Sequence, residues 1–126
     1  MSRTRDSYSC FYDQATNSVF ALGGHRPDGV LKSTEKWIIG ADSWEMASDL
    51  PDYAKHTAAV SSNSNEYVGY MVGGVTTSNN QVYTSKVWAL KRSDMQWVQL
   101  ESKSLQNKRR THSLVNIGST SAIPGC

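Results

Sequence analysis

Long apolar runs, cysteines and an excess of one charge are all scarce in this sequence. No apolar run approaches the roughly 20 residues that cross a bilayer, and none follows the basic residues near the start, so we expect neither a membrane span nor a secretory signal. The two cysteines, Cys10 and Cys126, cannot form a disulfide framework or a Cys-based zinc site. Lys and Arg number 13 and Asp and Glu 11, a balance that argues against a nucleic-acid surface. These shortages predict a cytoplasmic protein with reduced thiols.

Groupings of residues that carry chemistry are scarce as well. The chain has three histidines, and no pair of them has the spacing of zinc ligands on a helix. It has no Gly-x-Ser-x-Gly nucleophile motif and no glycine-rich loop that opens a helix around a phosphate. We therefore predict a protein that is not an enzyme and that uses no metal or cofactor.

What the sequence does contain is an internal repeat. The apolar segment 19–24 ends in Gly23-Gly24, and an equivalent segment ends in Gly73-Gly74, an offset of about 50 residues. Two Trp follow each pair of glycines, and a basic residue with a histidine then precedes the next apolar run. Each copy is rich in β-branched and aromatic residues between turn formers, so it predicts a unit of four short strands.

The predicted fold is therefore all-β, with two four-stranded antiparallel units. We expect strands over 7–12, 19–23, 35–39 and 44–47 in the first unit, which spans 7–55 after an N-terminal extension, 1–6. In the second unit, 56–110, we expect strands over 57–61, 67–73, 86–90 and 97–100. A further strand within 111–117 would open a third unit, and 118–126 matches no strand and is predicted to be a disordered tail.

The repeated pattern resembles the kelch repeat, whose unit is one four-stranded blade of a β-propeller. Glycines at a strand end permit positive φ and let a large ring lie against bare backbone, which a neighbouring Trp can fill. We expect these residues to be structural. The residues that carry the resemblance are Gly23, Gly24, Trp37, Trp44, Gly73, Gly74, Trp88 and Trp97.

Loop length distinguishes the two ends of such a unit. In an up-and-down sheet, the connections within 25–32, 48–55, 75–85 and 102–110 lie at one end, and the shorter connections lie at the other. Long loops on a rigid scaffold are where binding usually resides, and basic residues outnumber acidic ones here. We expect this end to bind a protein partner, such as an acidic peptide segment; ordinary solvated loops are the alternative. The candidate partner-binding residues are Arg26, Asp28, Lys32, Lys55, Lys108, Arg109 and Arg110.

The resemblance implies a non-enzymatic protein-protein interaction module. Kelch proteins include BTB-type substrate adaptors of ubiquitin ligases and actin-binding scaffolds, and some are enzymes, such as sugar oxidases and epimerases, so these classes stay open as alternatives. A closed propeller takes about four to eight blades, whereas this sequence supplies two and the first strand of a third, an open propeller. We therefore expect a fragment, self-association, or completion of the ring by other chains.

Overall fold

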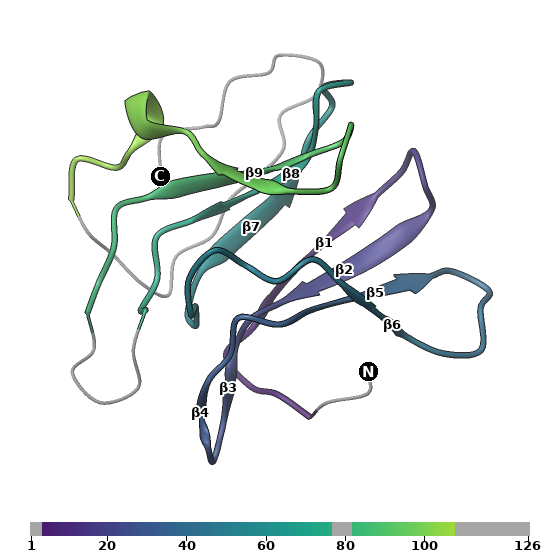
Figure 1. The fold of residues 1–126 in the computed structure, drawn as a ribbon, viewed down its shortest axis with the longest axis horizontal. Helices are drawn as coiled ribbons and strands as arrows, with labels where there is room; N and C mark the ends of the chain where they lie inside the picture. The colour runs from purple at the N-terminus through teal and green to yellow at the C-terminus, as the bar shows by residue number, and fades with distance from the viewer. Residues whose placement is uncertain (1–3, 77–81, 108–126) are drawn as a thin grey trace.

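A computed structural model describes residues 4–76 and 82–107, and within them the chain is all-β (Figure 1). Eight of its strands form two four-stranded antiparallel sheets, here called sheet 1 and sheet 2. Sheet 1 contains, in spatial order, β1 (Ser9–Asp13), β2 (Ser18–Leu22), β5 (Thr34–Ile38) and β6 (Glu45–Ala47). Sheet 2 contains β7 (Ala58–Ser61), β8 (Tyr67–Val72), β9 (Val87–Lys91) and β10 (Trp97–Gln99).

The eight expected strands in the two units are all present, with ends shifted by one or a few residues. The expected strand within 111–117 and the tail, 118–126, lie outside the described residues. Two short strands that we did not expect, β3 (His25–Arg26) and β4 (Gly29–Val30), form a separate hairpin. The one helical turn of the described residues is the 3-10 segment η1 (Glu101–Lys103).

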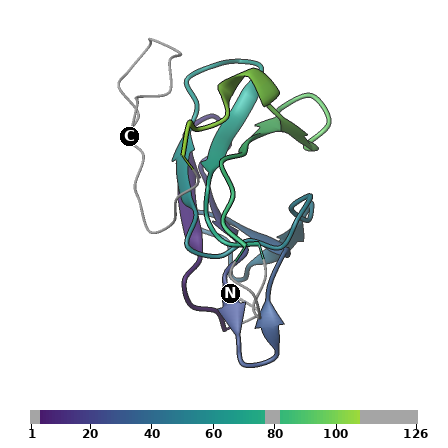
Figure 2. The ribbon, with the colours of Figure 1, turned by 90° about the vertical axis from the view of Figure 1, so that its left-hand side faces the viewer.

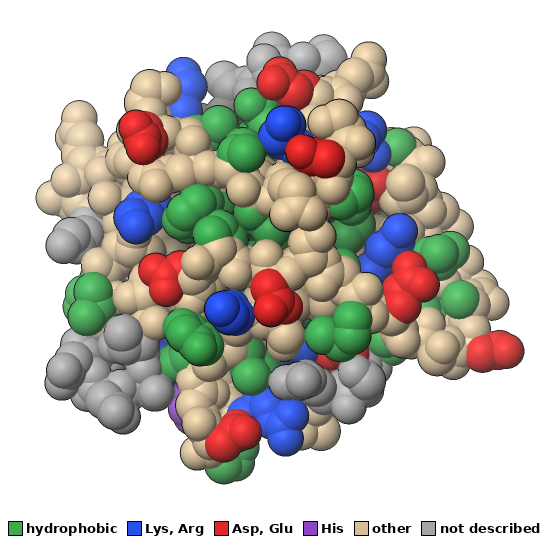
Figure 3. All heavy atoms as spheres, in the orientation of Figure 1, with side chains coloured by type: hydrophobic (Ala, Val, Ile, Leu, Met, Phe, Trp, Pro, Cys, Tyr) green, Lys and Arg blue, Asp and Glu red, His purple; other side chains and the backbone are tan. Residues whose placement is uncertain are grey.

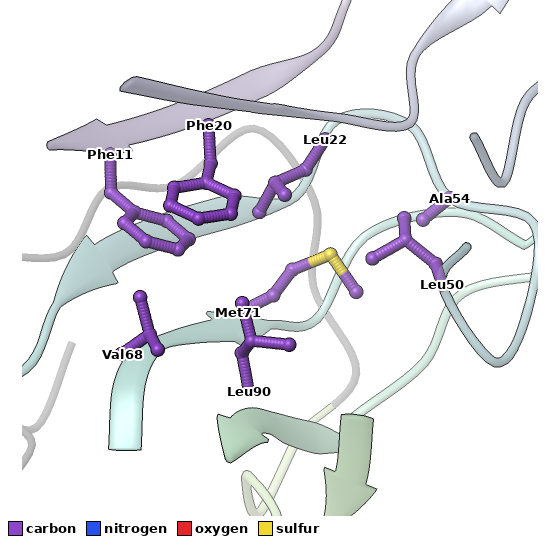
Figure 4. Packing of buried hydrophobic residues seen from close by; sticks show 8 residues of the cluster. All are labelled: Phe11, Phe20, Leu22, Leu50, Ala54, Val68, Met71 and Leu90. Atoms are coloured by element: carbon purple, nitrogen blue, oxygen red, sulfur yellow. The ribbon is translucent and has the colours of Figure 1, made fainter. Parts of the chain in front are cut away.

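The hydrophobic core lies between the two sheets (Figure 4). Sheet 1 contributes Phe11 and Phe20, whose rings stack with centroids 5.1 Å apart. Sheet 2 presents Met71 and Leu90 to them, and Leu50 enters from the connection between β6 and β7. Because each sheet buries one face on the other, this shared core holds the two repeated units together.

The two sheets approach most closely at β1 and β7, the first strand of each sheet. Backbones can come near there because β8 carries Gly69, where an added Cβ would lie 2.8 Å from the Phe11 ring. Figure 2 shows the sheets diverging from β1 and β7 toward the turns that precede β6 and β10. The described part of the molecule therefore has the form of a wedge.

The strand register changes one detail of the predicted repeat. Trp37 pairs with Val19, whereas Trp88 pairs with Met71, and the residue that corresponds to Trp37 by register is Leu90. The displacement is two residues, so the Trp88 side chain stays on the corresponding face of its sheet. Counting from the glycines does not reveal the displacement, because the connection between β8 and β9 is longer than the one between β2 and β5.

Candidate protein-binding surface

The three long connections of the described residues meet at one end of the sheets, here called the long-loop end. The first, 23–33, contains the β3–β4 hairpin, which Asp6 extends by backbone hydrogen bonds with His25 of 3.0 and 2.8 Å. In the second unit, Lys55 and Tyr83 flank Val75 through isolated bridges in the same way. Each unit therefore ends in a small three-segment ladder, so this end is fixed by backbone hydrogen bonds.

The connection between the sheets is fixed to the same end. Leu50 N–H donates to the Lys32 carbonyl at 2.7 Å, and Gly24 N–H donates to the Ala54 carbonyl at 2.7 Å. Gly23 has φ +59° and would place a Cβ only 2.3 Å from the Ala54 carbonyl oxygen, so glycine is required here. Gly23 thus has the expected positive φ, but the Ala54 backbone lies against it, whereas the sequence pattern predicts a tryptophan ring there.

Exposed large apolar side chains gather on these connections. Tyr53 is 48% exposed, Val82 47% and Tyr83 38%. The Lys32 ammonium lies 5.4 Å from the centre of the Tyr53 ring, within the range of a cation–π contact. Tyrosine is enriched at protein interfaces, because the ring offers apolar area and its hydroxyl a hydrogen bond.

The candidate basic residues differ in their surroundings. Arg26 Nε lies 3.6 Å from an Asp28 carboxylate oxygen on the hairpin, so these two charges largely cancel. Lys55 is half-buried, and its backbone pairs with Val75. Lys108, Arg109 and Arg110 lie outside the described residues. The described part of this end is therefore less basic than the whole-sequence count implied.

Charge is also mixed on the face of the molecule that Figure 3 presents. Lys and Arg side chains alternate there with Asp and Glu, separated by hydrophobic side chains. Among the described residues, Lys36 and Glu45 form an ion pair at 3.9 Å. This distribution offers no broad field of one sign for long-range attraction of a ligand.

The β3–β4 hairpin had a sequence signal that our strand analysis did not use. Pro27-Asp28-Gly29 is a strong turn sequence, because Pro fixes φ at the first corner and Gly accepts positive φ. Gly29 has φ +136°. Alternation of apolar and polar residues does not reveal this hairpin, because only two residues pair on each side.

A buried ion pair of the N-terminal segment was not foreseen either. Arg5 and Glu35 side chains are both fully buried, with guanidinium and carboxylate 2.6 Å apart. Arg5 also donates to the carbonyl oxygens of Gly23 at 2.7 Å and Ser33 at 3.0 Å. Arg5 therefore secures the segment before β1 to the base of the long-loop end, although residues 1–6 were predicted to be an extension.

The opposite end of the sheets is joined by a second ion pair. Asp13, the last residue of β1, accepts hydrogen bonds from Arg92 at 3.0 and 3.2 Å and from Thr16 at 2.5 Å. Burial by itself would raise the pKa of Asp13, but these hydrogen bonds and the Arg92 charge outweigh it and hold the pKa below 3.8. The pair links the two repeated units across their core.

A groove of about 280 Å³ opens between the sheets where they diverge. Phe20 and Leu90 form part of its lining, and Lys36, Glu45 and Trp97 also line it. The space is of the order of one or two side chains. Of its polar groups, Lys36 and Glu45 lie 3.9 Å apart, whereas Thr34 Oγ1 and Trp97 Nε1 are buried without a hydrogen-bond partner among the described residues.

The described residues lack two geometric features, a cluster of metal ligands and a membrane-spanning helix. They hold no cluster of three or more His, Cys, Asp or Glu that could bind a metal ion. Within these residues, no helix is long and apolar enough to span a bilayer. No family model and no curated protein matches the sequence.

Proposed function

We propose that this chain is a non-enzymatic protein-protein interaction module of the kelch type, acting in the cytoplasm as part of a substrate adaptor or scaffold. The paired glycines and the repeated order of strands support the kelch assignment. The proposed binding site is the long-loop end. Its partner is a peptide segment or loop of another protein.

One observation carries this proposal: the exposed side chains of Tyr53, Val82 and Tyr83 lie on connections that backbone hydrogen bonds hold in place. Binding residues on a rigid scaffold lose little entropy when a partner docks. Tyr is also one of the residues that most often contribute the largest share of the binding energy at protein interfaces. The three side chains therefore supply apolar anchors, and Lys32 supplies a donor beside them.

The preference for acidic partners rests on fewer residues than the binding itself. Lys32 is the cation that the structure places against an exposed ring, whereas Arg26 is paired with Asp28. Lys108, Arg109 and Arg110 provide the remaining positive charge. We propose that acidic residues of the partner increase its association rate, and that apolar contacts with the tyrosines provide most of the affinity.

The test uses a phage-displayed random peptide library and measures the binding of selected synthetic peptides by calorimetry. We expect peptides with apolar anchors flanked by acidic residues. Tyr53→Ser and Tyr83→Ser should each weaken binding about tenfold or more, as loss of a central aromatic contact does. Lys32→Gln should weaken binding less, and its effect should shrink at high salt.

Tyr12→Ser is the matched control, because Tyr12 is 43% exposed but lies on a strand of sheet 1 away from the long connections. It should leave peptide affinity unchanged. Selection of no peptide, or equal weakening by Tyr12→Ser and Tyr53→Ser, would contradict the proposed site.

A further inference from the structure

The face of sheet 1 that points away from sheet 2 carries a second set of exposed apolar side chains. Side chains alternate along strands, so residues next to the core-facing Phe11 and Phe20 lie on this outer face. Tyr12 is 43% exposed and Met46 52%. The outer face of sheet 1 is defined here by Cys10, Tyr12, Val19, Trp37, Trp44 and Met46.

Its two tryptophans form one contiguous aromatic surface. The Trp37 and Trp44 rings lie with centroids 6.1 Å apart, and the Trp37 indole N–H donates to the Ala41 carbonyl at 3.0 Å. Both side chains are half-buried. The polar atom of Trp37 is thus satisfied within the chain, which leaves the ring surfaces for packing.

The internal repeat allows the outer face of sheet 1 to be compared with the equivalent face of sheet 2. By strand register, Val19 and Trp37 correspond to Gly69 and Leu90 in sheet 2. Those two residues face sheet 1: Gly69 lies under the Phe11 ring, and Leu90 belongs to the core between the sheets. The same face of the repeated unit is therefore covered by another sheet in the second unit, whereas in the first unit no sheet of the described residues covers it.

We propose that a second copy of this chain covers the outer face of sheet 1, using the same face in a two-fold symmetric dimer. The face of sheet 2 that points away from sheet 1 cannot bind the outer face of sheet 1 of another copy. Its Tyr70, Val72 and Ala89 are already buried, at 8%, 1% and 0% exposed. A copy therefore offers its own outer face of sheet 1, and a two-fold axis sets like against like.

The electrostatics of the outer face fit self-association. The charged residue that points to this side from β5 is Glu35, and it is fully buried against Arg5. Two copies therefore meet through aromatic and apolar side chains without bringing like charges together. Tyr53, Val82 and Tyr83 lie on the long connections, so the dimer leaves the proposed peptide site open.

Sedimentation equilibrium over a range of concentrations tests the dimer. We expect the mass to rise to twice that of one chain, and Tyr12→Lys combined with Met46→Lys to weaken association about tenfold or more, because a buried charge opposes packing. Tyr53→Lys is the matched control, as Tyr53 is 48% exposed at the long-loop end. It should dimerise like the unchanged chain.

Cys10 supplies an independent readout, since its thiol is exposed on this face. In a Cys126→Ser chain, reaction of Cys10 with a thiol reagent should slow as protein concentration rises. This measurement applies to the native face even if the double variant fails to fold. A monomer at every concentration, or Cys10 reactivity independent of concentration, would overturn the dimer and would leave the peptide site untouched.

Discussion

Arg5 and Glu35 occupy a pair of positions that hold different kinds of side chain in the two units of the repeat. By register, Ala54 stands in the second unit where Arg5 stands in the first, and Trp88 stands where Glu35 stands. Ala54 and Trp88 both pack at the core. A buried ion pair therefore occupies in the first unit the positions that apolar side chains occupy in the second.

Removing one partner of this ion pair should be costly. Arg5→Met leaves the Glu35 carboxylate buried without its cation, and we expect a loss of about 3–5 kcal/mol in the free energy of unfolding by urea denaturation. Arg5→Met with Glu35→Leu should recover much of that loss, because no uncompensated charge remains. A double variant as unstable as the single one would contradict this account.

Asp13 makes stability depend on pH. Its pKa is lowered in the folded state, so Asp13 binds a proton more readily in the unfolded chain. The stabilisation is fully present above the unfolded value near 3.8 and is lost as pH falls through the lower folded pKa. Asp13→Asn should cost about 1–3 kcal/mol at neutral pH. Urea denaturation from neutral to acidic pH should show its difference from the unchanged chain shrinking toward low pH.

At the scale of elements, the eight repeated strands could be predicted because their apolar runs are separated by turn formers. The β3–β4 hairpin could not be found from strand patterns, since it pairs two residues on each side and the turn sequence was its one signal. The positions of Trp37 and Trp88 could not be matched from spacing, because the β8–β9 connection is longer than the β2–β5 connection. The Arg5–Glu35 contact joins residues that sequence spacing does not relate.

Gly74 and Gly40 separate two reasons for glycine within these elements. Both have strongly positive φ, +99° and +97°, but a Cβ on Gly74 would lie 2.5 Å from Thr57 Cγ2 and 2.8 Å from the Lys55 carbonyl oxygen. A Cβ on Gly40 would meet nothing within 4 Å. Gly40→Ala should therefore cost about 1–2 kcal/mol of unfolding free energy.

Gly74→Ala should cost clearly more than Gly40→Ala, because the added methyl group also displaces the segment that enters β7. Thermal and urea denaturation of the two variants give the comparison directly. Equal losses would show that backbone conformation alone accounts for the glycine and that close packing does not contribute.

At the scale of the whole molecule, the two sheets form a wedge. Their first strands, β1 and β7, lie close together, and the sheets diverge toward their last strands, β6 and β10. The long-loop end presents Tyr53, Val82 and Tyr83, and the outer face of sheet 1 presents Tyr12 and Met46. The two surfaces are separate. We therefore expect variants at one surface to leave the other unaffected in both the calorimetric and the sedimentation measurements.

The position at which a partner contacts the scaffold is the central prediction. A nitrogen-15 NMR titration of the 13.9 kDa chain with a selected peptide measures this for each backbone amide. We predict shifts at Lys32, Tyr53, Lys55 and Tyr83, with the connections 14–17 and 92–96 unchanged. Shifts confined to those short connections, or spread over the outer face of sheet 1, would contradict the proposal that the long-loop end is the protein-binding surface.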